Sequence, residues 1–245
     1  MTTGPDVGQH HFFVHLQKTA GTVMRQRLGA ALGEPAIYPN ASDGTNVYEV
    51  VVSVEHLRTR FEERCGEIEV VIGHFPLCTT SLLGTSFRTI TVLRDPVERT
   101  LSYLRHHRKM TPADRHKTLE EIYDDPFRFD GFIHNHMVKM FSLTTETMTA
   151  GMLTPVTFTG GHLERAKEAL IGIDAVGFQD DLDSFCVLLN ERFGWNVGSR
   201  PRFANRTEPV DVDPRLRDRI VEDNAMDVAL YEFASDLLRP RPDTP

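Results

Sequence analysis

The sequence predicts an α/β fold in three layers, with a central, mainly parallel β-sheet flanked by helices. Short apolar runs rich in β-branched and aromatic residues predict strands near residues 12–16, 69–72, 88–93 and 175–178. Segments with apolar residues three and four positions apart lie between these runs and predict helices. Strands that alternate with helices favour a parallel sheet, because each crossover helix packs on a face of that sheet.

The first predicted strand passes into a helix through residues 17–22, where small or hydroxyl-bearing side chains surround Lys18. A strand, a tight loop and a helix direct backbone N–H groups and the positive helix end at a phosphate, and Lys18 adds a positive charge there. The spacing is not that of a Walker A loop, so an ordinary connection with a solvated lysine is the alternative. The candidate anion-binding residues are Gln17, Lys18, Thr19, Ala20, Gly21, Thr22 and Val23.

The second junction follows the predicted strand at 88–93. Asp95 is a good N-cap and Pro96 suits the first position of a helix. Arg94 then lies at the carboxyl end of a strand, and Ser102 lies about two turns into the following helix. Ligands of open α/β sheets bind at the carboxyl ends of the strands. The chain therefore has two candidate anion sites, about 75 residues apart, each at a strand-to-helix junction.

Together, the motifs HLQKTAGT at 15–22 and RDPVERTLSY at 94–103 resemble those of sulfotransferases that use 3′-phosphoadenosine 5′-phosphosulfate (PAPS). The first motif is similar to their 5′-phosphosulfate loop, and is nearest to the Q-K-T-G-G-T form of heparan sulfate 6-O-sulfotransferases. The second is similar to their 3′-phosphate element, in which an arginine and a serine stand eight positions apart. The resemblance covers roughly residues 10–205 and implies a P-loop-like fold. We expect one domain over 1–245, with a helical C-terminal segment at about 213–238.

The resemblance implies that PAPS is bound by the first loop together with Arg94 and Ser102. Arg99 shares a helix face with Ser102 at i, i+3 and is a further candidate for the 3′-phosphate or for an acidic neighbour. Arg202 and Arg206 lie where the family has a late basic loop that closes over the nucleotide, although the glycine-rich spacing of many members is absent here. Ala20 also departs from the more usual Gly or Ser, and its methyl is tolerable if that residue is not at positive φ.

Sulfuryl transfer from PAPS to a hydroxyl builds negative charge on the departing bridging oxygen, where a fixed cation stabilises the transition state. The resemblance implies this role for Lys18. We predict that His74 is the base, because it follows a strand in a Gly-His-Phe-Pro turn and imidazole titrates near neutral pH. Glycan-sulfating members of the family have a histidine in a comparable Gly-His context. The alternative is that His74 is a structural turn residue.

Two other functions stay open from the sequence. One is an ATP-dependent phosphotransferase on a P-loop-like core, with residues 93–95 as a Walker-B-like strand end that holds Mg²⁺. Arg94 would crowd that metal with positive charge. The other is a nucleotide-binding module without turnover. The acceptor of the leading function is a hydroxylated carbohydrate, lipid or small metabolite.

Composition limits which binding partners and which cellular compartment we expect for this protein. The chain has 245 residues, 40% of them hydrophobic, and a net charge of −8, which argues against non-specific nucleic-acid binding. Cys65, Cys78 and Cys186 are odd in number and scattered, so we expect free thiols in a reducing compartment. No signal peptide or long apolar run is apparent, so we expect a cytoplasmic protein without a membrane anchor. His134 and His136 point apart on a helix, and we expect no metal site.

Other segments have clearer structural than functional signals. We expect helices at 54–65, capped by Ser53, at 132–141, at 182–193, closed by Gly194, and from Asp213-Pro214 to about Leu238. The polar stretch 112–130 is a candidate lid or acceptor-binding insertion. Phe193 and Trp195 are expected in the core, and His10 and His11 are expected to be solvated ahead of the first strand.

Overall fold

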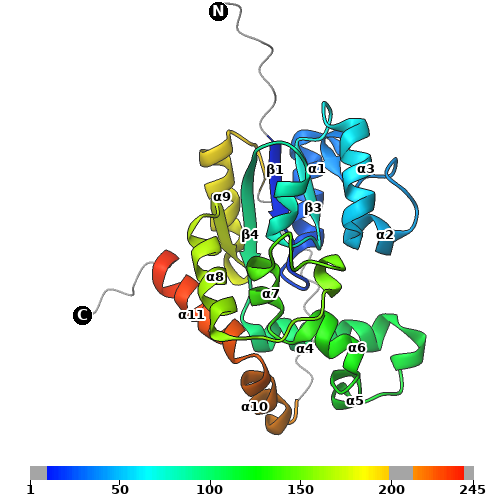
Figure 1. Ribbon diagram of the computed structural model, residues 1–245, viewed down its shortest axis with the longest axis vertical. Helices are drawn as coiled ribbons and strands as arrows, with labels where there is room; N and C mark the ends of the chain where they lie inside the picture. Colours follow the sequence, from blue (N-terminus) through cyan, green and yellow to red (C-terminus); the bar gives the residue numbers. More distant parts are fainter. Residues whose placement is uncertain (1–9, 199–211, 240–245) are drawn as a thin grey trace, which may run out of the picture.

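A five-stranded, entirely parallel β-sheet forms the centre of the computed structural model, which describes residues 10–198 and 212–239. The strand order is β2-β3-β1-β4-β5. The strands are β1 (His10–Val14), β2 (Ile37–Tyr38), β3 (Val70–Gly73), β4 (Phe87–Leu93) and β5 (Ala175–Phe178). The predicted three-layer fold with a parallel sheet is confirmed (Figure 1).

The strand order explains why the two candidate anion sites meet. The chain fills one side of β1 with β3 and β2, and then crosses to place β4 and β5 on the other side. Val14 pairs with Thr91 in the β1–β4 register, so the two strands end close together. The loop after β1 and the start of the helix after β4 therefore lie at the switch point of the sheet, which is the usual place for a ligand in this architecture.

Helices cover both faces of the sheet, and further helices lie across its lower end in Figure 1. The α-helices are α1 (Gly21–Leu32), α2 (Val47–Val52), α3 (Val54–Arg64), α4 (Pro96–Met110), α5 (Leu119–Tyr123), α6 (Pro126–Arg128), α7 (His136–Ser142), α8 (Gly160–Ile171), α9 (Leu182–Phe193), α10 (Pro214–Asp223) and α11 (Ala225–Leu238). One turn of π-helix, η4 (Phe129–Ile133), joins α6 to the segment before α7. Short 3₁₀ turns are η1 (Glu34–Ala36), η2 (Leu77–Leu82), η3 (Pro112–Asp114), η5 (Gly151–Leu153) and η6 (Gln179–Asp181).

The side chains of β1 alternate between the two faces of the sheet and belong to a different hydrophobic cluster on each face. Phe13 packs in a cluster with Met24 and Leu28 of α1 and with residues of α9. Phe12 and Val14 belong to a larger cluster with residues of α3, α4, α7, α8 and α11. Successive strand side chains point to opposite faces, so odd-numbered residues of β1 face α1. This periodicity continues to His15, just beyond the strand.

Several predicted boundaries need correction. The first strand begins two residues earlier than expected, at His10, because β3 and β4 both extend far enough to pair with that end. His10 and His11 are therefore buried within the sheet, and His10 Nδ1 hydrogen-bonds to the carbonyl of Ile68 at 2.8 Å. The expected helix at 132–141 begins only at His136, after the π-turn. Ser53, Asp95 and Gly194 cap their helices as predicted.

The predicted single C-terminal helix is wrong, since Asn224 separates α10 from α11. The break lets α11 exchange caps with α7. Asp227 accepts hydrogen bonds from the backbone N–H groups of Met137 and Val138 at 3.0 and 2.8 Å. In return, Asn135 Oδ1 accepts from the N–H groups of Met226 and Asp227, both at 3.1 Å. Each helix start thus satisfies backbone donors of the other.

The polar stretch proposed as a lid packs against α4 at the bottom of Figure 1. Its Asp114 is fully buried and pairs with Arg128 at 2.7 Å and with Lys117 at 3.1 Å. A capping box between Thr118 and Glu121 starts α5. These contacts hold the segment on α4, and its role as a lid stays a prediction. Across the described residues, each helix is too short or too polar to cross a membrane.

Candidate functional site

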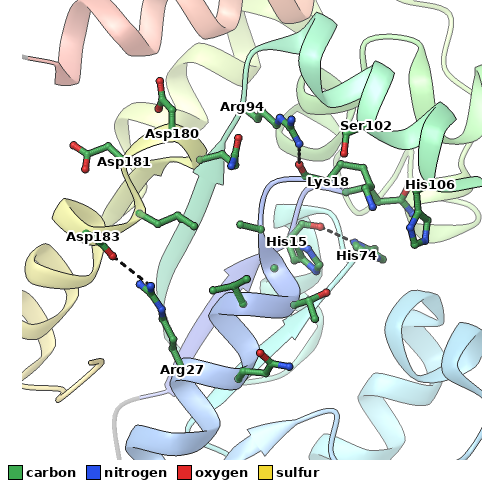
Figure 2. A pocket seen from close by; sticks show the side chains of 18 of the residues that line it. His15, Lys18, Arg27, His74, Arg94, Ser102, His106, Asp180, Asp181 and Asp183 are labelled. Carbon is green, nitrogen blue, oxygen red and sulfur yellow. Dashed lines mark hydrogen bonds and ion pairs between the residues drawn. The ribbon is translucent and has the colours of Figure 1, made fainter. Parts of the chain in front are cut away.

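A large open pocket of about 1120 Å³ lies at the switch point of the sheet. The loop after β1, the start of α1, the turn after β3, the middle of α4 and the β5–α9 connection surround it (Figure 2). Its lining residues include Gln17, Lys18, Ala20, Gly21, Thr22, Val23, His74, Arg94 and Ser102. The structure thus brings together most of the residues that the two sequence motifs predicted. Arg202 and Arg206 lie outside the described residues.

The loop after β1 is held in an unusual backbone conformation. Lys18 and Ala20 have φ angles of 67° and 70°, in the left-handed region. The condition under which the Ala20 methyl was expected to be tolerable is therefore not met, and alanine there costs about 1 kcal/mol relative to glycine. Thr19 lies between them with its side chain fully buried, and its Oγ1 donates to the carbonyl of Leu16 at 2.8 Å. Residues in such conformations concentrate at ligand sites, where the surrounding structure enforces them.

The start of α1 offers a second anion-binding feature. Ala20 is the N-cap residue but its side chain makes no capping bond, and the first turn of the helix has no acidic residue. The first N–H groups of a helix have no partner within that helix, and they carry the positive end of its dipole. Ala20, Gly21, Thr22 and Val23 all line the pocket. This helix end therefore favours a negatively charged group.

Arg94 connects the two motifs directly. Its Nη1 donates to the backbone carbonyl of Lys18 at 2.9 Å, and its Nε is buried without a hydrogen-bond partner among the described atoms. Burial lowers the pKa of Lys18, with a further contribution from the nearby charge of Arg94. Burial is also the main reason that the pKa of Arg94 is lowered. Two partly buried cations side by side repel one another, so an anion between them would stabilise both.

The prediction that Arg99 contacts the cofactor is wrong. Arg99 is fully buried and does not line the pocket, and its Nη1 and Nη2 donate to the backbone carbonyls of Phe132 and Ile133 at 3.1 and 3.0 Å. It therefore caps the π-turn η4 and belongs to the core. Ser102, three positions further along α4, does line the pocket. The i, i+3 spacing that suggested a shared role for Arg99 and Ser102 therefore did not bring both side chains into the pocket.

His74 is held by two backbone contacts. Its N–H donates to the carbonyl of Val51 at 2.7 Å, and its Nδ1 hydrogen-bonds to the carbonyl of His15 at 2.8 Å. A carbonyl oxygen only accepts, so Nδ1 must carry the proton, and Nε2 of the neutral ring then has a free lone pair. Burial lowers the pKa of His74 below the usual 6.5, partly offset by the bond to His15. The ring is therefore neutral at pH 7 and can accept a proton at Nε2.

His15 and His106 are pocket residues that the sequence analysis did not select. The imidazole of His15 lies beside that of His74, with ring centroids 4.3 Å apart. His106 lies one helical turn after Ser102, close to Lys18 in Figure 2. Its i+4 spacing from Ser102 could have indicated a shared face. His15 lies at an odd-numbered position after β1, on the α1 face of the sheet. This alternation could have indicated that its side chain lies beside the start of α1.

The opposite wall of the pocket is acidic. Asp180, Asp181 and Asp183 follow β5 and lie on the far side of the pocket from Lys18 in Figure 2, with Asp180 and Asp181 pointing away from Lys18 and Asp180 paired with Arg239 at 2.7 Å. Asp183 forms an ion pair with Arg27 of α1 at 3.3 Å, and Asp181 caps α9. Each of these carboxylates thus has a partner of its own, whereas Lys18 and Arg94 supply positive charge on the other side of the pocket. The described residues contain no group of three or more His, Cys, Asp or Glu placed to share a metal ion.

Comparison with models of known protein families finds no match for this chain, and comparison with curated proteins also finds none. The fold does match solved structures. One is a sulfotransferase from Alicyclobacillus acidocaldarius, with a TM-score of 0.53 over 96% of this chain and 98% of that one, at 16% sequence identity. The similarity shows that this chain has the fold of that sulfotransferase. Because one fold can support several activities, the function has to be argued from the site.

Proposed function

We propose that the protein is a PAPS-dependent sulfotransferase that transfers a sulfuryl group to a hydroxyl of an acceptor. The observation that carries this proposal is the contact between Arg94 and the backbone of Lys18 at the uncapped start of α1. Two cations from different motifs meet there in one pocket. Each of these two cations can bind an anionic group, so a ligand that carries more than one such group fits this arrangement.

The donor set fits the two anionic ends of PAPS. Lys18 and the N–H groups at the start of α1 would hold the 5′-phosphosulfate, and Arg94 with Ser102 would hold the 3′-phosphate. The buried, unpartnered Nε of Arg94 supports this assignment, because such a donor is costly to leave unsatisfied. When bound, PAPS supplies the sulfuryl group that is transferred. Arg202 and Arg206 remain candidates for the nucleotide from sequence alone.

The chain's own groups suit the two needs of this reaction. The ammonium of Lys18 provides a fixed positive charge where negative charge develops on the leaving oxygen. The free lone pair on His74 Nε2 is available to accept the proton of the acceptor hydroxyl. Lys18 and His74 line the same pocket, so one ligand-binding region contains both.

The phosphotransferase alternative has less support. Its Walker-B-like reading needs the Asp95 carboxylate for Mg²⁺, but Asp95 Oδ1 accepts a hydrogen bond from the N–H of Glu98 at 2.9 Å. One oxygen of that carboxylate is therefore used in capping α4. The acceptor of the proposed reaction is a carbohydrate, a lipid or a small hydroxylated metabolite, and the proposal retains the cytoplasmic location expected from the sequence.

The proposal is tested first by ligand binding. 3′-Phosphoadenosine 5′-phosphate (PAP), the desulfated product, should raise the melting temperature, whereas ATP with Mg²⁺ at the same concentration should not. Lys18→Ala should reduce the PAP effect, and Arg88→Ala, which changes an arginine at the other end of β4, should not. A larger stabilisation by ATP with Mg²⁺ than by PAP would favour the phosphotransferase.

Turnover is tested with ³⁵S-labelled PAPS and cell extract, followed by mass spectrometry of the labelled products. If Lys18 acts mainly in the transition state, Lys18→Ala should lower kcat much more than it weakens PAP binding. Firm PAP binding without any labelled product in a range of extracts would instead support the nucleotide-binding module.

A further inference from the structure

The imidazole of His15 lies directly over the first residue of α1. A Cβ atom added to Gly21 would lie 1.7 Å from His15 Nε2, 2.1 Å from Cε1 and 2.2 Å from Cδ2. No real Cβ approaches another atom so closely, so the ring occupies the space that any side chain at position 21 would need. His15 and Gly21 are thus sterically coupled.

Backbone conformation does not explain the glycine. Gly21 is the first residue of α1 and is absent from the glycines with positive φ. Alanine at such a position is normally favourable in a helix. The three atoms nearest to an added Cβ all belong to the His15 ring. The need for glycine at position 21 therefore comes from His15.

The His15 ring also lies against the ring of the proposed base. The imidazoles of His15 and His74 have centroids 4.3 Å apart and planes 33° from parallel. The backbone of His15 also accepts the Nδ1–H of His74 at 2.8 Å, and its own N–H donates to the carbonyl of Gly73 at 3.2 Å. His15 therefore contacts His74 through both its backbone and its side chain.

We propose that His15 is a positioning residue, whose ring, seated on Gly21, holds the His74 imidazole with Nδ1–H on the His15 carbonyl and Nε2 free. The consequence for catalysis rests on the proposed function, whereas the structural coupling does not. Movement of α1 at Gly21 would pass through the His15 ring to His74. The phosphate-binding loop and the base would then be linked by two contacts.

A competing explanation is that Gly21 is small only to let a phosphate approach the backbone. The two explanations differ in a double variant. If His15 makes the glycine necessary, Gly21→Ala should be harmful alone and nearly harmless in a His15→Ala background, where the ring is gone. If ligand approach makes it necessary, Gly21→Ala should weaken ligand binding equally in both backgrounds.

The main readout is the His74 ring in ¹⁵N-labelled protein, assigned by the signal that disappears in His74→Gln. In the wild type we expect one neutral tautomer, with the proton on Nδ1 and slow exchange of that proton. Gly21→Ala and His15→Ala should each increase this exchange at least tenfold or produce a mixture of tautomers. Gly160→Ala is the matched control, because Gly160 also begins a helix and an added Cβ would meet nothing within 4 Å.

Calorimetry with PAP provides the second readout. Gly21→Ala should weaken PAP binding at least fivefold, and the double variant should recover to within about twofold of His15→Ala. An unchanged Nδ1–H signal in both single variants, or equal PAP losses from Gly21→Ala in the two backgrounds, would overturn the proposal. Failure of wild-type protein to bind PAP would refute the proposed function, and the tautomer measurement would still decide the role of His15.

Discussion

At the scale of single residues, Arg94 combines a structural contact to the loop with the proposed contact to the ligand, and the sequence indicated only the second. One N–H of its guanidinium supports the left-handed loop by donating to the Lys18 carbonyl. Its Nε is buried without a hydrogen-bond partner among the described atoms, and Arg94 lines the pocket where the ligand is proposed to bind. A change at Arg94 therefore alters the loop as well as the proposed 3′-phosphate contact.

Arg94→Ala should weaken PAP binding by about 2–3 kcal/mol, the usual scale for a charge-assisted contact. AMP, which lacks the 3′-phosphate, should bind more weakly too, by a smaller amount, because the loop loses its support. Ser102→Ala is the control, since it should weaken PAP while leaving AMP binding unchanged. Equal losses of PAP and AMP by calorimetry with Arg94→Ala would assign this arginine to the loop alone.

The proposed base predicts the pH dependence of the reaction. A base must be deprotonated to act, so the rate should fall as the pH drops through the pKa of His74. Because burial lowers that pKa, the acid limb should lie below pH 6.5. His74→Gln should reduce turnover by about 100-fold or more and remove the limb, as measured by a pH–rate profile. A His74→Gln enzyme with nearly normal turnover would exclude His74 from catalysis.

At the scale of elements, the reciprocal caps between α7 and α11 attach the C-terminal helix to the core. Asn135 has φ of 44° and uses its side chain to cap α11, so it combines an unusual backbone conformation with a tertiary contact. Asparagine tolerates the left-handed region better than other non-glycine residues. Substitutions to glycine and to alanine can therefore measure the cap and the backbone conformation separately.

Asn135→Gly should lower the free energy of unfolding by about 2 kcal/mol, because it keeps the backbone conformation and leaves N–H groups of α11 without their acceptor. Asn135→Ala should cost about 1 kcal/mol more, since alanine is strained at positive φ. Urea unfolding measures both. A glycine variant as stable as the wild type would show that the cap contributes little, and a glycine variant less stable than the alanine variant would show that the left-handed conformation contributes little.

At the scale of the whole molecule, several imidazoles are buried in their neutral form. Burial lowers the pKa of His11 to about 4, and lowers those of His15 and His136 well below 6.5. Burial raises the pKa of Asp227 to about 6. The unfolded chain binds protons on its histidines below pH 6.5 that the folded chain does not, whereas Asp227 has the opposite effect below pH 6.

The protein should therefore lose stability as the pH falls from about 6.5 towards 5. Burial also lowers the pKa of His107 to about 4 and lowers those of His74, His106, His134 and His162, so these histidines outweigh the single aspartate and the free energy of unfolding should fall with pH. Urea unfolding at several pH values measures this slope. His11→Phe should reduce it by about 1.4 kcal/mol per pH unit. A stability that stays constant from pH 7 to 5 would contradict the burial of these neutral rings.

Local signals accounted for much of the fold and for the core of the candidate site. The apolar runs placed four of the five strands to within two residues, and Asp95 with Pro96 placed the start of α4 correctly. The loop residues and Arg94 were found because each lies at a strand-to-helix junction. The break at Asn224 was missed, because it depends on caps donated by a helix almost ninety residues earlier.

The sequence alone determined most of the order of strands and helices, the two candidate anion-binding junctions and the candidate base, since each depends on residues close together in the chain. Only the tertiary structure decided which of those residues share a pocket. It placed Ser102 in the pocket and Arg99 in the core, although both lie on α4, because the π-turn η4 presents its carbonyls to Arg99. It likewise seated His15 between Gly21 and His74, since β1, α1 and the turn after β3 meet only when the sheet is assembled.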